Sequence, residues 1–312
     1  VEGGHLARRE GGWESAIRWL RFAVDDGRGA PVDTSREAMD DDAFEPYMKA
    51  FVQAVYAHLK ARGRHRRYVQ HIADEPIEAN HESWLALRDK VKSWLPAVAN
   101  IDATCCAQVA GKVDWRVPQI QHVRPGDRAA GEQLWSYVCL APRGRHPNRF
   151  LDYASIRNRI IFWLSFSLDL NGFLHWGYNS WKAWTQVPVP LPRSPWYDAS
   201  GGSIYVNDRQ PLPAGDPFVV YPGRHRLCSS IRWEVVRKGM EDYEYLRLLA
   251  DHVEHGRGPD ALRRQASHLL TQVTTELAAD SLHYTRDDAL LLQTRRRIGE
   301  LLAAFHEHGE RG

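Results

Sequence analysis

Between Tyr68 and Leu249, short apolar runs alternate with amphipathic helical patterns, and this alternation constrains the fold of the chain more than any other feature. A chain that alternates strands with helices builds a parallel sheet whose crossovers are right-handed. Its 312 residues suffice for one barrel-sized domain or two smaller ones. The predicted strands are 68–73, 100–105, 113–120, 134–140 and 172–178. The predicted helices are 44–59, 80–95, 156–168 and 231–249.

Three regions depart from the alternation. Residues 17–23 and the turn Asp25-Asp26-Gly27 predict a hairpin before the first long helix. Segment 186–217 is rich in proline and glycine and is too long for an ordinary connection, which favours a loop that covers the side of the sheet where the functional site lies. From Gly256 onward the chain is charged and carries helical patterns without strand signals, which predicts a helical extension.

The charge balance argues against a nucleic-acid or membrane partner. The formal net charge is +2 with 26% charged residues, so no strong field surrounds the chain. The dense basic run 62–67 falls between a helix and a strand and is interpreted as a solvated loop. No run of about 18 apolar residues occurs that could span a membrane. Twelve tryptophans and twelve tyrosines offer flat faces that suit sugar rings, although most of them are expected in the core.

The cysteines and histidines predict neither a metal site nor a disulfide framework. The four cysteines show no metal-ligand spacing, and vicinal Cys105 and Cys106 rarely bridge, so free buried thiols are expected. This weakly favours a reducing compartment. The start Val1–His5 does not read as a signal peptide, and the compartment, cytoplasmic or secreted, stays open. No HExxH-like spacing occurs, and no metal or other cofactor is expected.

The segment from His71 to Pro76, with the sequence HIADEP, carries the strongest chemical signal. It places the adjacent carboxylates Asp74 and Glu75 at the end of a buried apolar run, which Pro76 stops because proline cannot donate to a sheet ladder. Strand ends next to loops are where α/β barrels place catalytic groups. Of two neighbouring acids, one can hold its proton while the other stays ionised, and such a pair divides acid and base roles. A solvated Asp-Glu turn is the common alternative.

Four motifs in order extend this signal: HIADEP at His71, GFLHWGYN at Gly172, VYPG at Val220, and SIRWE at Ser230 followed by EDYE at Glu241. Together they resemble the catalytic domain of glycoside hydrolase family 123, the β-N-acetylgalactosaminidase-type enzymes. The resemblance runs from about His5 to Leu249.

The resemblance implies an α/β fold of the TIM type, a (β/α)8 barrel. In that barrel Asp74 and Glu75 would end the fourth strand, and the four later predicted strands would be the fifth to eighth. A single strand, around Val1–His5, precedes them, so the first strands of the barrel are expected to be missing from residues 1–254. Such a barrel would leave open edges and exposed apolar faces. Residues 255–312 would form the helical extension.

The resemblance also implies a retaining, substrate-assisted exo-β-N-acetylhexosaminidase that acts on glycans. Two carboxyls that act from opposite sides of a sugar ring stand at least about 5 Å apart. Neighbouring residues at one strand end rarely reach that arrangement. Adjacent carboxylates fit the substrate-assisted mechanism instead, in which the 2-acetamido group of the sugar is the nucleophile. Glu75 would be the general acid and then the base. Asp74 would stay ionised, orient the acetamido N–H and stabilise the oxazolinium charge.

Further side chains are candidates for binding the sugar. The Tyr137 hydroxyl could hold the acetamido carbonyl oxygen, and Trp176 is favoured as the stacking platform. Because side chains alternate along a strand, His175 and Trp176 share a face only if the strand ends between them. The other candidates are His5, Tyr178, Asn179 and Trp181, with His71, Asp216 and Tyr221 as weaker ones. The charged series Arg232, Glu234, Arg237, Glu241 and Asp242 is interpreted as structural, with Arg232 the first exception to consider.

Two alternatives remain open. One is a glycosidase of the same fold that acts on a sugar without an acetamido group, and the other is a carbohydrate-binding barrel without catalysis. The residues do not distinguish a galacto- from a gluco-configured sugar, and they leave the natural substrate and the oligomeric state undecided.

Overall fold

A computed structural model describes residues 19–20, 23–25, 31–33, 37–38, 45–128, 131–181, 196, 204–205 and 210–309. The chain divides into two compact units. The first comprises Val1–Pro118 with Gly131–Leu134, and the second comprises Gln119–Ala130 with Trp135–Gly312. The predicted strand around Val1–His5 and most of the predicted loop 186–217 lie outside the described residues.

Five strands form a sheet in the order β5-β6-β7-β8-β9, and every neighbouring pair is parallel. Its strands are β5 (Gln70–His71), β6 (Asn100–Asp102), β7 (Trp115–Arg116), β8 (Gln133–Tyr137) and β9 (Gly172–Leu174). The parallel order confirms the α/β prediction. The described residues form an open sheet, so closure into a (β/α)8 barrel stays a prediction.

All five strands are shorter than predicted. The sequence predicts a strand over 68–73, but only Gln70 and His71 pair with β6. Ile72 and Ala73 are buried without being part of the ladder. The apolar run in the sequence therefore indicates which residues are buried, but it is longer than the hydrogen-bonded strand.

Short antiparallel pairs flank the sheet in sequence. Ahead of it, β2 (Ala23–Asp25) pairs with β3 (Pro31–Asp33), as the predicted turn after Asp25 requires, and β1 (Trp19–Leu20) pairs with β4 (Glu37–Ala38). After it come two more pairs, β10 (Ile204–Tyr205) with β11 (Gln210–Pro211) and β12 (Tyr221–Pro222) with β13 (Leu227–Cys228). Short 3-10 helices occupy His65–Arg67, Ala107–Val109 and Ile120–His122.

Two helices bury the apolar side chains of the first unit. Helix α2 (Glu45–Ala61) is followed by Gly63 at φ +66°, the left-handed conformation that ends helices, as predicted. Helix α3 (His81–Trp94) starts after Asn80, as predicted, but the Asn80 side chain accepts the amide of Ile77 instead of capping the helix. The core of this unit contains Val52, Ile72, Ala73, Trp84, Leu87, Val91, Trp94, Leu95, Val98, Val109 and Val113.

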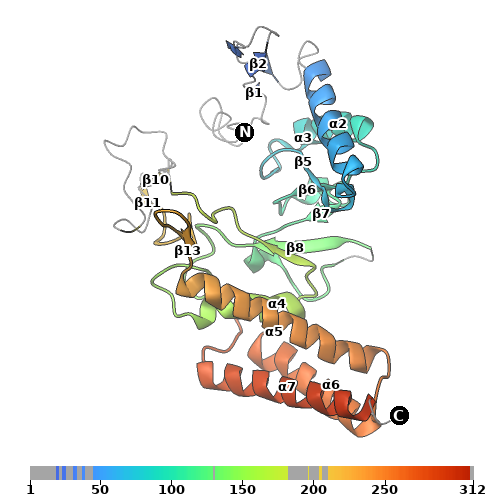
Figure 1. The fold of residues 1–312 in the computed structure, drawn as a ribbon, viewed down its shortest axis with the longest axis vertical. Coiled ribbons are helices and arrows are strands. Elements are labelled where there is room, and N and C mark those ends of the chain that lie inside the picture. Colours follow the sequence, from blue (N-terminus) through green and yellow to red (C-terminus); the bar gives the residue numbers. More distant parts are fainter. Residues whose placement is uncertain are drawn as a thin grey trace. The chain divides into compact units, whose positions relative to one another are not determined.

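Four long helices form layers in the second unit (Figure 1). They are α4 (Ile156–Ser167), α5 (Ile231–Glu254), α6 (Asp260–Gln272) and α7 (Asp288–Gly309), with a π-helical turn Val273–Leu277 after α6. Helix α5 packs against α4 on one side and against α6 and α7 on the other. The helices at 156–168 and 231–249 and the helical end of the chain are thereby confirmed.

One buried carboxylate joins three of these helices. Asp242 of α5 is 1% exposed and accepts hydrogen bonds from Arg159 at 2.6 and 2.9 Å, from Trp163 at 2.8 Å and from Arg295 at 2.9 Å. Its donors come from α4 and α7. Because a buried charge is costly unless it is paired and hydrogen-bonded, these three donors compensate the burial of the carboxylate. Asp242 is therefore structural, as the sequence indicates.

The remaining charges of α5 form ion pairs within the helix. Arg237 contacts Glu234 at 2.9 Å and Glu241 at 2.6 Å, and Lys238 contacts Glu241 at 2.8 Å. All of these groups are solvent-exposed, and pairs of this kind stabilise a helix by about 0.2–0.5 kcal/mol each. They confirm the structural interpretation of this series.

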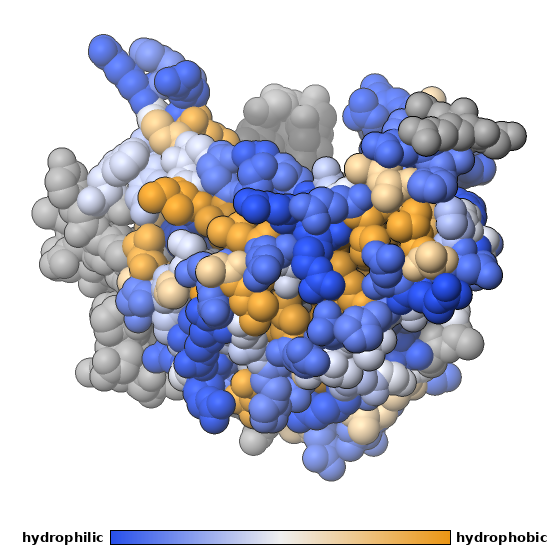
Figure 2. Space-filling model, turned by 90° about the horizontal axis from the view of Figure 1, so that it is seen from below, coloured by the Kyte–Doolittle hydropathy of each residue, from blue (hydrophilic) through white to orange (hydrophobic). Residues whose placement is uncertain are grey.

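The face drawn in Figure 2 carries apolar side chains among many hydrophilic ones. Large exposed examples on the last long helix are Leu290 and Leu292. None of the helices in the described ranges is long and apolar enough to cross a bilayer. All four cysteines are free, as predicted, but the expectation that they are buried is wrong, because Cys105 is exposed and the other three are partly exposed.

Candidate active site

The two adjacent carboxylates lie just beyond the carboxyl end of β5. Ile72 and Ala73 are buried, Asp74 is exposed, and Glu75 is partly exposed. The chain thus passes from the core to the surface within two residues. The pair follows directly on a buried apolar run, as the sequence indicates, and its catalytic role stays a prediction.

Glu75 has an unusual backbone conformation. Its φ is +50°, in the left-handed region that residues other than glycine rarely adopt. Such a conformation costs on the order of 1 kcal/mol or more, and it persists only where the surrounding structure holds it. Strain of this kind clusters at functional sites, so the backbone marks Glu75 independently of its side-chain chemistry.

Residues at the end of β6 contact both sides of the carboxylate pair. The Asp102 carboxylate accepts the Ala73 amide at 3.4 Å, and the Thr104 hydroxyl donates to the Pro76 carbonyl at 2.7 Å. Asp102 is 1% exposed and Thr104 is 4% exposed. The backbone is therefore held immediately before Asp74 and immediately after Glu75.

Asp102 also pairs with His71, the last residue of β5. His71 Nε2 lies 3.0 Å from Asp102 Oδ1, although the contact lacks good hydrogen-bond geometry, and Oδ2 accepts the indole N–H of Trp84 at 3.0 Å. Burial lowers the pKa of His71, but the neighbouring carboxylates of Asp102 and Asp74 outweigh it and raise that pKa above its usual value. Burial raises the pKa of Asp102 despite its three partners. The strand ends thus form one polar network under the carboxylate pair.

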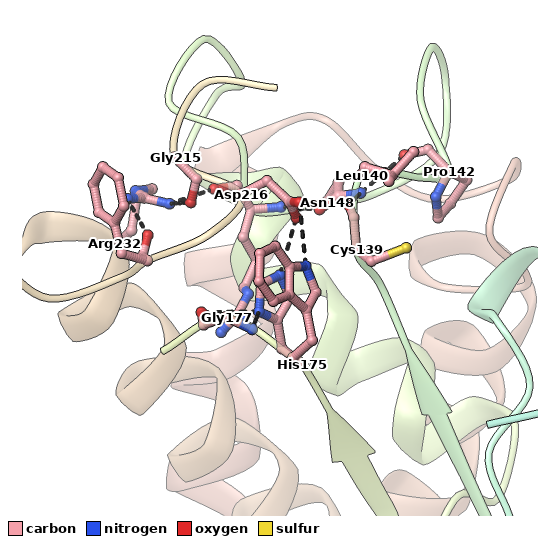
Figure 3. Close-up of polar contacts among 12 residues, drawn as sticks. Cys139, Leu140, Pro142, Asn148, His175, Gly177, Gly215, Asp216 and Arg232 are labelled. Carbon is pink, nitrogen blue, oxygen red and sulfur yellow. Dashed lines mark hydrogen bonds and ion pairs between the residues drawn. The ribbon is translucent and has the colours of Figure 1, made fainter. Parts of the chain in front are cut away.

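The end of β9, in the second unit, carries a second polar cluster (Figure 3). Because β9 ends at Leu174, the alternation of side chains ends with it. The rings of His175 and Trp176 are nearly parallel, at an interplanar angle of 19°, and both approach the Asp216 carboxylate. His175 Nε2 lies 3.4 Å from Oδ1 without hydrogen-bond geometry, and Trp176 donates to Oδ2 at 3.2 Å.

Two buried arginines surround this cluster. Arg232 donates to the carbonyls of Arg149, Gly215 and Phe218 at 2.7–2.8 Å, which ties α5 to the loop that carries Asp216. Arg232, the first exception considered to the structural interpretation of its series, therefore has structural contacts too, because its guanidinium donates to backbone carbonyls. Arg149 is 5% exposed, and its Nε has no hydrogen-bond partner among the described residues.

Burial dominates the electrostatics of this cluster. Burial raises the pKa of Asp216 to about 7, against the opposing effects of the Trp176 hydrogen bond and of the nearby arginines. Burial and the neighbouring Arg232 lower the pKa of Arg149 to about 9. Burial and then Arg149 lower the pKa of His175 well below its usual value, so its ring is neutral. Nδ1 of this ring lies 3.0 Å from both the amide nitrogen and the carbonyl oxygen of Gly177.

The other sequence-predicted residues differ in accessibility. Tyr137 ends β8 and is 7% exposed, whereas Trp176 and Tyr178 are exposed to 42% and 39%. Asn179 is exposed, and the indole N–H of Trp181 donates to the Val220 carbonyl at 2.8 Å, which gives Trp181 a structural partner. His5 lies outside the described residues. Asp216 is 1% exposed, and its contact with a ligand stays a prediction.

A cavity of about 380 Å³ lies beside β9 within the second unit. It is lined by residues of β9, α4 and α5 and by the side chains of Arg149, His175 and Tyr178. Its walls are mostly apolar, with Phe173 and Trp233 among them. No group of three or more metal-binding side chains occurs in the part of the chain that the structure describes.

Sequence reasoning missed Asp102, Thr104 and Arg149. Asp102 ends a three-residue strand, and Thr104 follows it closely, a position where polar residues are common. The sequence predicts a strand over 100–105 with Asp102 inside it, whereas β6 ends at Asp102, so the position of this residue at the carboxyl edge of the sheet was not visible from the sequence. Arg149 gives no local signal, since only the fold buries it.

The comparison with known protein families decides the affiliation of the chain. Residues 13–249 match the family described as glycoside hydrolase 123, catalytic domain. The chain belongs to glycoside hydrolase family 123. The resemblance read from the four motifs is thereby confirmed over nearly the same range.

A solved structure supports the fold of this family 123 chain. It is a family 123 glycoside hydrolase from Clostridium perfringens, studied for glycolipid glycan hydrolysis. The TM-score is 0.53 at 14% sequence identity, which shows similarity of fold alone. The match covers 94% of this chain and 50% of the clostridial chain, so this chain spans about half the length of that protein. None of the curated proteins matches the chain.

Proposed function

We propose that this family 123 chain supplies the catalytic residues of a retaining, substrate-assisted exo-β-N-acetylhexosaminidase, with β-N-acetylgalactosaminides as the leading substrates. The observation that carries the proposal is the accessible, adjacent pair Asp74 and Glu75 beyond the carboxyl end of β5. Catalytic groups of parallel α/β sheets lie at that end of the strands. Family membership supports hydrolysis of a glycosidic bond.

Adjacency favours participation by the substrate. An inverting pair stands about 6.5–9.5 Å apart to admit water, and a retaining pair with a protein nucleophile stands about 5–5.5 Å apart across the ring. Neighbours beyond one short strand do not easily face each other across a sugar. In the substrate-assisted route the 2-acetamido oxygen attacks the anomeric carbon, so both carboxylates can work from one side.

The two carboxylates then have distinct roles. Glu75 gives its proton to the leaving glycosidic oxygen while the acetamido oxygen bonds to the anomeric carbon. Water next attacks that carbon, Glu75 takes the proton of the water, and the acetamido group is released. Asp74 stays ionised, accepts the acetamido N–H and stabilises the positive charge of the oxazolinium intermediate.

The proposal assigns substrate contacts to several further side chains. Trp176 and Tyr178 offer exposed aromatic faces suited to stacking on the apolar face of a sugar ring. Tyr137 would hold the acetamido oxygen through its hydroxyl, and His175 is a further proposed sugar contact. Asn179, Trp181 and His5 complete the proposed set.

Turnover of aryl glycosides tests the proposal. The whole protein that carries this chain would be assayed on p-nitrophenyl β-N-acetylgalactosaminide, β-N-acetylglucosaminide and β-galactoside. We expect hydrolysis of the acetamido sugars and inhibition by a thiazoline analogue of the intermediate. A glycan of a glycolipid belongs in the panel because the similar clostridial enzyme was studied for that hydrolysis.

Three variants separate the roles. Glu75→Gln should lower kcat by about 10²–10⁴-fold, as loss of a general acid does, while substrate binding is retained. Asp74→Asn should lower kcat on acetamido substrates. The exposed neighbour Glu78 supplies the matched control, and Glu78→Gln should leave the rate unchanged. Full activity of Glu75→Gln, or turnover of the plain galactoside alone, would contradict the proposal.

A further inference from the structure

We propose that Asp102 and Thr104 are positioning residues that hold Glu75 in its left-handed backbone conformation and thereby set the place of its acidic proton. The inference rests on the proposed function of Glu75 and assigns part of that function to the neighbouring strand β6. Both residues belong to the first unit, as do Asp74 and Glu75.

The backbone of Glu75 requires such support. With φ at +50°, the residue occupies a region that costs free energy relative to the extended or helical alternatives. A partly exposed loop residue would relax to an ordinary φ unless both of its flanks were held. Relaxation would rotate the carboxyl about the chain and move its proton away from the leaving oxygen.

Thr104 holds the chain after Glu75. Its hydroxyl donates to the Pro76 carbonyl at 2.7 Å and accepts the Cys106 amide at 2.9 Å. The side chain is 4% exposed, so water does not readily replace either bond. Two bonds of opposite sense fix the rotation of the hydroxyl, which makes Thr104 a rigid anchor for the Pro76 carbonyl.

Asp102 holds the chain before Asp74. Its Oδ2 accepts the Ala73 amide at 3.4 Å and the Trp84 indole at 3.0 Å, and its Oδ1 lies 3.0 Å from His71 Nε2. These contacts fix the orientation of a carboxylate that is almost completely buried. The long amide contact alone is weak, but His71 adds a second connection from the same carboxylate to β5.

The anchors are themselves fixed by the sheet. Val117 donates its amide to the Asp102 carbonyl at 3.0 Å and accepts the Thr104 amide at 3.2 Å. Asp102 and Thr104 are thus separated by one residue on a backbone that continues the ladder towards β7. The loop with the catalytic pair is held at two points by one stiff segment, and such pre-organisation is what general acid catalysis requires.

The test uses the leaving group of the substrate. A glycoside with a good leaving group, such as 2,4-dinitrophenol, needs little protonation, whereas a phenyl glycoside depends on the general acid. Thr104→Val removes the hydroxyl and keeps the shape. We expect kcat on the phenyl β-N-acetylgalactosaminide to fall by about 10-fold or more, in the range that a misplaced catalytic group costs, with little change on the dinitrophenyl substrate. Thr104→Ser should restore the wild-type ratio of the two rates.

A matched control and a second variant complete the design. Thr294 of α7 is equally buried, and its hydroxyl donates to the Leu290 carbonyl at 2.9 Å, so Thr294→Val tests the loss of a comparable bond remote from the pair. We expect no change in either rate. Asp102→Asn should lower the phenyl rate selectively, and it keeps the proposal testable if Thr104→Val does not fold.

The outcomes distinguish the inference from the function on which it rests. If Glu75→Gln loses activity while folded Thr104→Val and Asp102→Asn keep the wild-type ratio of rates, the inference fails and the proposed function stands. Equal loss on both substrates would also overturn it, since that is a general structural effect. If Glu75→Gln keeps its activity, the proposed function itself fails.

Discussion

Removal of the buried carboxyl of Asp216 should change how the stability of the second unit depends on pH. The side chain is 1% exposed, and its pKa is raised to about 7 in the folded chain. The reference value for an unfolded aspartate is 3.8. Between these values the folded state keeps a proton that the unfolded state has released. The stabilisation is therefore fully present below about pH 4 and is lost as the pH rises through about 7.

The magnitude follows from the difference of about 3 pH units. At 1.36 kcal/mol per unit, the free energy of unfolding should fall by at most about 4 kcal/mol across this window because of Asp216 alone. Asp216→Asn lacks this titration. Its free energy of unfolding, minus that of the wild type, should therefore increase with pH by up to about 4 kcal/mol.

Urea unfolding at about pH 4.5 and about pH 7.5 measures this difference. Asp280 is the matched control, because burial raises its pKa but the hydrogen bonds from His283 and the neighbouring amides outweigh burial and lower that pKa. Asp280 therefore stabilises above its unfolded pKa and loses this effect only as the pH falls, so Asp280→Asn should show no change in this window. A pH-independent difference for Asp216→Asn would refute the assignment of Asp216 as the group that titrates near 7.

Four further variants test helix packing, a buried ion pair and backbone strain. A methyl group at Gly239 would lie 2.4 Å from the Phe162 ring, so Gly239→Ala should lower the thermal midpoint. The control is Gly299→Ala, whose methyl group would meet no atom closer than 3.6 Å and should raise the free energy of unfolding by about 1 kcal/mol. Asp242→Asn, which leaves two arginines without their charge partner, should destabilise by about 3–5 kcal/mol in urea unfolding, and a loss below about 1 kcal/mol would contradict it. Glu75→Gly should abolish turnover and yet stabilise the chain by about 1 kcal/mol, because glycine tolerates the left-handed φ; a lower thermal midpoint would contradict the strain.

The order of helices and parallel strands was predictable because apolar periodicity reports which face of a segment is buried. Helix α5 shows this best, since its apolar positions predicted 231–249 and the helix continues to Glu254. The lengths of strands were not predictable, because pairing depends on the partner. Val113–Ile120 has the composition of a strand, but the regular strand β7 comprises Trp115 and Arg116, and beyond it Val117 and Gln119 make isolated pairings.

In the candidate site, too, the features with a local sequence signal were predictable and those that depend on distant contacts were not. The acidic pair at Asp74 was visible because its signal is local, a polar step at the end of an apolar run. Asp102 contacts Ala73 from 29 residues away along the chain, and no local sequence pattern around either residue predicts this contact. The left-handed backbone of Glu75 was equally hidden, since glutamate has no preference for it.

The three-way contact of Asp242 has a consequence for how this family member can be shortened. The family match ends at residue 249, inside helix α5, whereas Arg295, one of the donors to Asp242, lies far beyond that point on α7. Its guanidinium also lies over the ring of Tyr245, at 3.3 Å from the centroid. A clone cut at the family boundary would remove a cation from a buried carboxylate and uncover the side of α5 that α6 and α7 protect. The family match and the packed helices of the second unit therefore end at different residues, and a truncation series should keep α6 and α7.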